Sequence, residues 1–330
     1  VFCAALLNAQ PMGFYAPAQI VRDARDHGVE VRPICVNASR WDCTLEPTDR
    51  EGRFAVRLGL RMVDKLANAD AAAIVGGRAD RPYADADDVW RRSAARVSAL
   101  VRLAEADAFR PSLGLARREA LWAIRALRDE PLPLFAAAAG EDGRPAPEIN
   151  EEAVALKAMT AGREVVEDYQ HVGLSLRRHP VAFLREELTR DTVVTCAQVN
   201  ATRDGRIVKT AGLVLVRQKP GSAKGVMFIT LEDETGVVNL VIWPDLYEKQ
   251  RRVILGASLM GVLGRVQREG EVVHVVATRL FDLSVQLASI GERDEAFPLP
   301  HGRGDEFHHG SRGPDPREVT ALKIRPRDFR

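Results

Sequence analysis

The feature that most constrains this chain is a pair of alternating segments within residues 211–250. In residues 226–231 the apolar side chains that would face a core occupy the odd positions, and in residues 237–243 they occupy the even positions. A period of two is that of a β-strand with one buried face. The intervening Glu-Asp-Glu-Thr-Gly is typical of a turn, because Gly236 can adopt a positive φ at little cost. The segment therefore predicts a β-hairpin that lies on a hydrophobic core.

Three further strands are expected around this hairpin. One strand begins near Arg206 and precedes the hairpin, and strand-like runs follow at residues 259–267 and 272–281, separated by an Arg-Glu-Gly turn. A short helix is expected between the third and fourth strands. Residues 193–201, ahead of the barrel, fit either a strand or a short helix, of which the helix is favoured. Five strands with a helix between the third and the fourth is the order of an OB-fold, a small barrel that many proteins use to bind single-stranded nucleic acids and sugars.

The charge of the chain is balanced overall and basic only locally. Its 330 residues carry 47 Lys and Arg against 46 Asp and Glu, a net charge of +1, so total charge gives no reason to expect nucleic acid. Residues 203–224, beside the expected sheet, hold six basic residues and one acid. Such a cluster is either an ordinary solvated face or the rim of a nucleic-acid site.

Cysteine usage and hydropathy bear on where the protein works. Cys3, Cys35, Cys43 and Cys196 form no CxxC pair, as expected for thiols in a reducing cytoplasm. No apolar run approaches the roughly 20 residues of a membrane span, so no membrane partner is expected. The length fits two or three domains. Because the chain begins with Val1 inside an apolar run, we expect it to be the C-terminal part of a longer protein.

The predicted nucleic-acid surface combines an aromatic side chain with a cationic rim. In OB-folds, ligands bind the exposed face of the second and third strands and the loops around it. Stacking of a base on an aromatic ring contributes about 1–3 kcal/mol, and basic side chains add salt-dependent attraction to phosphates. Trp243, which precedes Pro244 at the strand end, could stack on a base but is interpreted as core at the barrel end. His274 is interpreted as a structural polar residue. The predicted DNA-binding residues, two of them in the helical block described below, are Lys65, Asn68, Lys209, Arg217, Lys219, Lys224, Phe228 and Asn239.

Three segments resemble a known family. Residues 5–46, ALLNAQPMGFYAPAQIVRDARDHGVEVRPICVNASRWDCTLE, are similar to the end of the fingers region of bacterial C-family DNA polymerases. Their QPMGFY is most similar to the error-prone, damage-inducible paralogue of the alpha subunit. Residues 169–184, YQHVGLSLRRHPVAFL, resemble the family segment that leads into the OB domain, and the final LKIRPRDFR resembles the family's C-terminus.

The resemblance places a helix-hairpin-helix at residues 58–75. In this motif two short helices meet at a Gly-rich turn, and exposed amides at the start of the second helix hold a phosphate. The family pattern has a glycine, a small apolar residue and another small residue at the turn, where this chain has Lys65-Leu66-Ala67. The glycines are missing, and Lys65 would offer a point charge instead. The alternative is an ordinary helical pair in a scaffold.

Two groups of potential metal ligands are given structural roles. Asp85-Ala86-Asp87-Asp88 contains a D-x-D pair, which in polymerases holds catalytic metals on a rigid strand. Here, acids followed by arginines are typical of the start of a helix, and we expect capping. His301, His308 and His309 have no Cys or carboxylate spacing that would close a metal site, so a solvated loop is expected.

A docking motif for the sliding clamp is a further candidate. Pro131-Leu132-Pro133-Leu134-Phe135 resembles the short linear motif by which bacterial polymerases bind the clamp, in which Leu132, Leu134 and Phe135 would enter an apolar groove. The motif usually begins with Gln, and Pro131 stands there instead. The alternative is a hydrophobic anchor on a neighbouring domain.

The resemblance implies the activity of a full-length protein. It implies a DNA-directed DNA polymerase that extends primers across damaged templates with deoxynucleoside triphosphates and Mg²⁺. The family's palm carboxylates have no counterpart in these residues, so no catalytic residue and no bound metal or cofactor is expected in this chain. The implied partners are primer-template and single-stranded DNA, the sliding clamp and a Y-family-like accessory protein. The alternative is a stand-alone OB-fold module that binds nucleic acid or docks a partner without catalysis.

The expected fold class is α+β multidomain, a helical block with a degenerate helix-hairpin-helix followed by a five-stranded OB-fold barrel. The expected segments are the end of the fingers region at 1–48, the helix-hairpin-helix domain at 49–130, a linker and helices with the clamp motif at 131–190, the OB-fold domain at 191–283 and a polar tail at 284–330.

Overall fold

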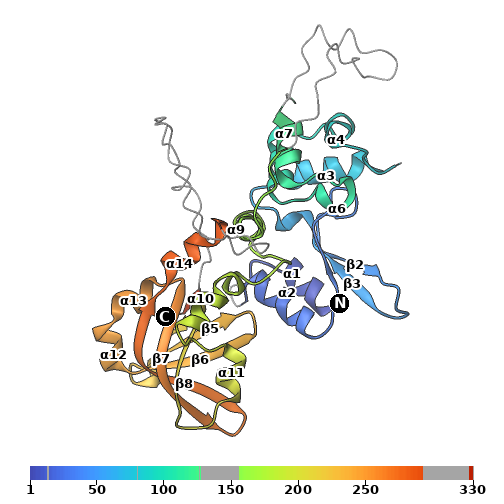
Figure 1. Ribbon diagram of the computed structural model, residues 1–330. Helices are drawn as coiled ribbons and strands as arrows, with labels where there is room; N and C mark the ends of the chain where they lie inside the picture. The colour runs from blue at the N-terminus through green and yellow to red at the C-terminus, as the bar shows by residue number, and fades with distance from the viewer. Residues whose placement is uncertain (13–14, 80, 126, 128–155, 293–326, 330) are drawn as a thin grey trace, which may run out of the picture. The chain divides into compact units, whose positions relative to one another are not determined.

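The structure is a computed structural model that describes residues 1–12, 15–79, 81–125, 127, 156–292 and 327–329 (Figure 1). The chain divides into two compact units, and each is described by itself. The first unit comprises Val1–Met159 and Gln170–Leu176, and the second comprises Thr160–Tyr169 and Arg177–Arg330. The expected helix-hairpin-helix falls in the first unit and the expected barrel in the second.

The first unit packs helices around a small sheet. The strands β1 (Val31–Arg32), β2 (Thr44–Pro47) and β3 (Phe54–Arg57) lie in the order β1-β3-β2. The helices are α1 (Phe2–Asn8), α2 (Pro17–Asp26), η1 (Leu60–Met62), α3 (Asn68–Gly77), α4 (Ala86–Ser93), α5 (Val97–Glu105), α6 (Arg110–Leu113) and α7 (Arg117–Arg125). Their apolar faces share one core, in which Leu7, Leu58, Ile74, Leu100 and Phe109 are fully buried.

The start of α4 confirms the structural interpretation of the acidic run. The Asp85 side chain caps the helix by accepting a hydrogen bond from the Asp88 amide at 2.7 Å. The Asp88 carboxylate accepts from Arg92 at 3.0 Å, and Asp87 pairs with Arg91 at 2.9 Å. These carboxylates are therefore engaged in starting a helix and in ion pairs along it.

The second unit begins with short helices and continues into the barrel. Those before the barrel are α9 (Ala161–His171), η2 (Pro180–Leu184), α10 (Arg185–Arg190) and α11 (Cys196–Ala201). Of the helix expected at residues 193–201, α11 confirms the part from Cys196 to Ala201, which starts with a capping box between Thr195 and Gln198. Val194 instead forms a parallel β-bridge with Thr210. After the barrel come α14 (Ser284–Ala288), η4 (Ser289–Glu292) and the short strand β9 (Arg327–Phe329).

The barrel is a closed five-stranded sheet. Its strands are β4 (Ile207–Gln218), β5 (Met227–Asp233), β6 (Gly236–Ile242), β7 (Leu259–Glu269) and β8 (Val272–Asp282). β4 pairs with β5, β5 with β6, β6 in parallel with β8, β8 with β7, and β7 again with β4, which closes the circle. The helices α12 (Pro244–Lys249) and α13 (Arg251–Gly256) connect β6 to β7. The predicted OB-fold is confirmed.

The turn of the central hairpin is shorter than predicted. Glu232 and Asp233 belong to β5 and are buried, so only Glu234 and Thr235 form the connection. The Asp233 Oδ1 atom accepts hydrogen bonds from the amides of Thr235 and Gly236 and from the Thr235 hydroxyl. Asp233 therefore fixes the turn from inside the strand, which holds β5 and β6 in register.

One side of the barrel is covered by the preceding helices. Val181 and Leu184 of η2 and Leu188 of α10 share a core with Ala211 and Leu213 on the outer face of β4. An ion pair of 3.0 Å between Arg185 and Asp233 adds a polar contact to this apolar packing. The outward side chains of β5 and β6 lie outside the three buried clusters found in the described residues.

Candidate nucleic-acid interface

The outward face of β5 and β6 places an aromatic ring beside a polar pair. Phe228 lies opposite Val241, and Thr230 lies opposite Asn239. All four are half-buried, whereas their neighbours along each strand point into the barrel core. The Thr230 hydroxyl donates a hydrogen bond to the Asn239 side-chain oxygen at 2.9 Å. The predicted outward orientation of Phe228 and Asn239 is confirmed, and their contact with DNA stays a prediction.

His274 extends the polar row onto a third strand. It pairs in register with Asn239, so Thr230, Asn239 and His274 form a line across β5, β6 and β8. The Nδ1 atom of His274 is buried and has no hydrogen-bond partner among the described residues. A hydroxyl, an amide and an imidazole side by side offer both donors and acceptors to the edge of a base that stacks nearby.

Trp243 belongs to this face and was missed as a site residue. The outward alternation of Asn239 and Val241 continues to Trp243, directly after β6, where 54% of the side chain is exposed. The interpretation as barrel-end core is therefore wrong. The period of two already indicated the outward orientation, but a large apolar side chain at a strand end is more often buried.

The loop between β4 and β5 supplies the predicted cations. Lys219 and Lys224 are exposed, and the Lys219 ammonium lies 4.0 Å from the centre of the Tyr247 ring on α12. Lys224 has φ 48°, and a Cβ on the following Gly225 would lie 3.4 Å from the Pro244 side chain. The loop therefore packs against the start of α12, next to Trp243. It brings positive charge to the end of the outward face that carries Phe228 and Trp243.

Arg217 does not belong to this rim, and its prediction as a DNA-binding residue is wrong. Only 3% of it is exposed, and its guanidinium donates to the carbonyls of Ile254 and Ala257, both at 2.6 Å. The physical reason is a bulge between Val214 and Val216, which shifts the alternation so that Arg217 points inward. There it caps the carbonyls at the end of α13, where a positive charge is stabilising.

Lys209 is half-buried and belongs to a different part of the surface. It lies in the half of β4 that pairs with β7, opposite Leu263, rather than in the half that pairs with β5. Its ammonium donates to the Asp191 carbonyl at 2.9 Å and lies 5.9 Å from the centre of the Phe281 ring. The structure therefore does not bring Lys209 together with Phe228.

The second candidate surface is the turn between η1 and α3. Lys65 occupies the position of the family's glycine and has a left-handed backbone with φ 60°. α3 begins without a side-chain cap, and the structure records no acceptor for the amides of its first residues, Asn68 and Ala69, among the described residues. Lys65 and Asn68 are exposed beside these amides. The turn thus has a left-handed backbone at the position of the glycine and carries a cation, whose ammonium lies 3.5 Å from the exposed Asp64 carboxylate.

A charged contact fixes the start of α3. Asp70 is buried in the first helical turn and accepts hydrogen bonds from Arg96, the shortest of 2.6 Å, at the start of α5. These bonds hold the pKa of Asp70 below its usual value. The amide of Asp64, in the turn itself, donates to the His171 carbonyl at 2.8 Å. Contacts with Arg96 on one side and with the His171 carbonyl on the other therefore fix the hairpin.

Two other predicted sites, the clamp motif and the tail histidines, fall where the structure is not described. The clamp-motif residues Leu132, Leu134 and Phe135 and the tail histidines lie outside the described residues. Across the part of the chain that is described, no three His, Cys, Asp or Glu side chains gather as a metal site would require. The helices of that same part are all too short or too polar to cross a bilayer.

Two family descriptions match the chain at these two surfaces. Residues 28–120 match a helix-hairpin-helix motif, and residues 208–283 match an OB-fold nucleic acid binding domain. The first match includes the Lys65 turn, and the second includes the outward face of β5 and β6 together with Trp243.

Similar proteins cover the whole chain. Error-prone DNA polymerase 1 of Agrobacterium fabrum is 65% identical over 99% of this chain and 30% of its own length. Error-prone DNA polymerase 2 of Rhizobium meliloti is 64% identical over 100% of this chain and 30% of its own length. The chain thus spans about 30% of the curated relatives it matches. Among solved structures, asparaginyl-tRNA synthetase from Pyrococcus horikoshii is 24% identical over 28% of this chain and 23% of its own, with a TM-score of 0.23, too small a likeness to support an inference.

Proposed function

Because this chain belongs to the error-prone DNA polymerases, with 61–65% identity over essentially its whole length, we propose that it is the C-terminal, DNA-holding part of such an enzyme. The full-length protein would synthesise DNA on damaged templates, using deoxynucleoside triphosphates and Mg²⁺ bound by a palm outside this chain. The enzyme would act in the repair of damaged DNA in the cytoplasm of a bacterium. Its partners would be a sliding clamp and a Y-family-like accessory protein.

Within that enzyme, the two surfaces would hold different parts of the DNA. The turn at Lys65 offers a cation and two helix amides that have no acceptor within the described part of the chain, and both suit the phosphates of a duplex. The barrel face offers aromatic rings and a polar row, which suit unstacked bases of a single strand. The observation that supports the proposal most strongly is that Phe228 and Trp243 lie on the same outward face of the barrel. The exposed Lys219 and Lys224 lie in the loop beside Trp243.

A docking surface for a protein partner is the competing interpretation of the same face. Apolar outward residues such as Val241 would also suit a partner. The exposed lysines of the adjoining loop favour nucleic acid, because the core of a protein interface is depleted of charged residues. The two interpretations predict opposite results for a short oligonucleotide.

Trp243→Ala tests the proposal with a matched control. Removal of one stacking ring costs about 1–3 kcal/mol, so the variant should bind a single-stranded oligonucleotide at least about 5-fold more weakly than the unchanged chain. Trp122→Ala on α7 removes an equally exposed tryptophan, 54% in both cases, from the other unit. Fluorescence anisotropy of a labelled oligonucleotide measures both affinities.

The control separates stacking from general loss of an aromatic side chain. The proposal expects Trp122→Ala to bind the single strand as the unchanged chain does. Equal affinities of all three proteins would show that the face from Phe228 to Trp243 does not hold DNA. A melting curve for each variant shows whether it is folded.

A further inference from the structure

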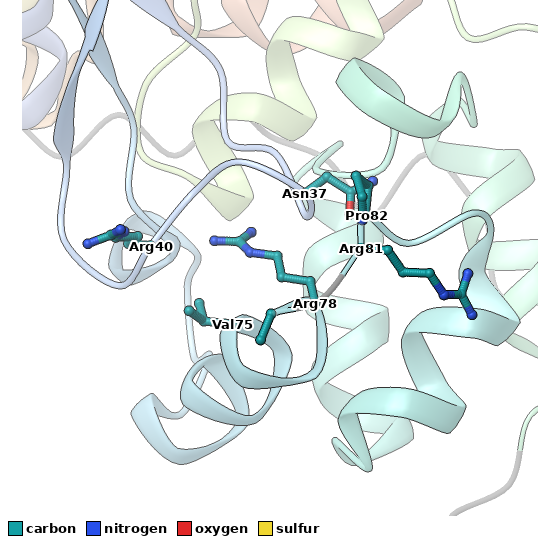
Figure 2. A pocket seen from close by; sticks show the side chains of 7 residues that line it. Asn37, Arg40, Val75, Arg78, Arg81 and Pro82 are labelled. Carbon is teal, nitrogen blue, oxygen red and sulfur yellow. The ribbon is translucent and has the colours of Figure 1, made fainter.

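A hollow of about 350 Å³ lies at the C-terminal end of α3, remote along that helix from the Lys65 turn. Its wall includes three arginines, Arg40, Arg78 and Arg81, together with Asn37 and Pro82 (Figure 2). No residue of this hollow was singled out from the sequence. The residues come from the segment before β2, from the end of α3 and from the start of the segment that leads to α4.

Arg78 builds one wall of the hollow and keeps its charge. Its guanidinium donates to the carbonyls of Val36 at 2.6 Å and Ser39 at 2.5 Å, which fixes the turn that carries Arg40. These acceptors are neutral, so they satisfy the hydrogen bonds without cancelling the positive charge. Burial lowers the pKa of Arg78, and the like charge of Arg40 contributes in the same direction. Keeping Arg78 charged in this position therefore costs free energy, and a bound anion would offset that cost.

Arg40 adds a second, accessible cation. It is exposed, and in Figure 2 the side chain of Arg78 extends in the direction of Arg40, whereas Arg81 points away. Within the described residues neither Arg40 nor Arg78 forms a salt bridge, while Arg81 lies 3.5 Å from Asp88. The end of α3 carries about half a negative charge, which the guanidinium groups exceed. Among the described residues, no carboxylate therefore compensates the positive charge of Arg40 and Arg78 at the hollow.

The shape of the hollow favours a phosphate group of a longer molecule. Guanidinium groups bind phosphate through two parallel hydrogen bonds, and their planar fork selects it over a spherical anion. The exposed Arg40 can present such a fork, whereas both Nη atoms of Arg78 already donate to carbonyls, so Arg78 contributes mainly its charge. A volume of about 350 Å³ lies at the lower end for small-molecule sites, and the hollow opens to solvent. The ten residues of α3 place it about 15 Å from the amides at the start of that helix. One nucleic-acid backbone can span that distance.

We propose that this hollow binds a backbone phosphate of DNA through Arg40 and Arg78, as a second, sequence-independent contact of the unit that carries the hairpin. The proposal rests on the DNA-holding function proposed above and adds a site to it. The two ends of α3 would then grip one backbone at two points, through helix amides and Lys65 at one end and through guanidinium groups at the other.

Arg40→Ala in the whole chain is the test. Arg78 is left intact because it supports the turn at Val36–Ser39. For a labelled primer-template, the slope of log affinity against log salt should become smaller by about one, with weaker binding to every sequence. Arg40→Lys should recover part of the affinity because it restores the charge but not the fork. Arg53→Ala, another exposed arginine of the same unit, is the matched control and should leave the slope unchanged.

The outcomes separate this site from the proposed function. If the unchanged chain binds DNA and Arg40→Ala has the same slope and affinity, the hollow is not a DNA site while the function stands. If the chain does not bind DNA, but inorganic phosphate raises its melting temperature and Arg40→Ala abolishes that rise, the hollow takes a free phosphate and the DNA proposal falls. Binding by Arg53→Ala as weak as that by Arg40→Ala would also overturn it, because any surface charge would then have the same effect.

Discussion

At the scale of single residues, Asp70 connects the stability of the hairpin to pH. The folded state lowers its pKa through the hydrogen bonds from Arg96, so the unfolded chain binds the proton more readily. The contribution to the free energy of unfolding is therefore present at neutral pH. It is lost as pH falls from the usual value of about 3.9 through the lower value of the folded protein.

Asp70→Asn should remove this contribution. Hydrogen bonds to charged groups contribute about 1.5–3 kcal/mol, but 64% of the Arg96 side chain is exposed, so we expect a loss of about 1 kcal/mol at pH 7. Urea unfolding of both proteins at several pH values measures the difference. It should shrink below about pH 4. A difference that persists at pH 2 would mean that shape rather than charge is responsible.

Four residues show what the sequence pattern could and could not predict at this scale. The period of two placed Phe228 and Asn239 correctly, because their strands run without interruption. Arg217 was misplaced, because a bulge inserts one residue and nothing in the sequence of β4 signals it. Trp243 was misplaced for another reason, since a large apolar side chain at a strand end is more often buried. The alternation predicted the outward orientation of Trp243 correctly, whereas its residue type favoured burial.

At the scale of elements, the turn between η1 and α3 carries its own strain. Lys65 has φ 60°, a conformation that costs an ordinary residue about 1–2 kcal/mol and costs glycine almost nothing. Glycine also loses more entropy on folding, which offsets part of that gain. The turn therefore combines the left-handed backbone conformation typical of glycine with the positive charge of a lysine.

Lys65→Gly should leave the free energy of unfolding unchanged or raise it by up to about 1 kcal/mol. The same variant should weaken binding of a primer-template and reduce the salt slope by about one, because the amides of α3 remain while the charge is gone. Denaturant unfolding and salt-dependent anisotropy measure the two effects. Clear destabilisation would contradict the left-handed backbone, and unchanged DNA binding would leave Lys65 without a role.

The elements differ in how far the sequence predicted them. The five barrel strands were predicted because each has a strong period of two, and a helix was favoured over a strand at residues 193–201, within which α11 forms. The sheet of β1, β2 and β3 was not predicted. β2 and β3 have only four residues each, and a period of two is not recognisable over so short a length.

At the scale of the whole molecule, function depends on where charge is placed rather than on its total. The net charge of +1 hides a basic loop beside Trp243, a cation at the hairpin and two arginines at a hollow. The loop cluster was visible in the sequence because its residues are consecutive. The hollow was not, because Arg40 and Arg78 lie 38 positions apart and meet only through the fold.

The measurement that tests the account most directly is the affinity of the whole chain for a single-stranded oligonucleotide at increasing salt. Two or three phosphate contacts predict that affinity falls roughly 7- to 20-fold between 50 and 200 mM salt, in a straight line on logarithmic axes. Stacking on Phe228 and Trp243 predicts that measurable binding remains at the higher concentration. An affinity that does not change with salt, or no binding at 50 mM, would contradict the claim that this barrel face holds DNA.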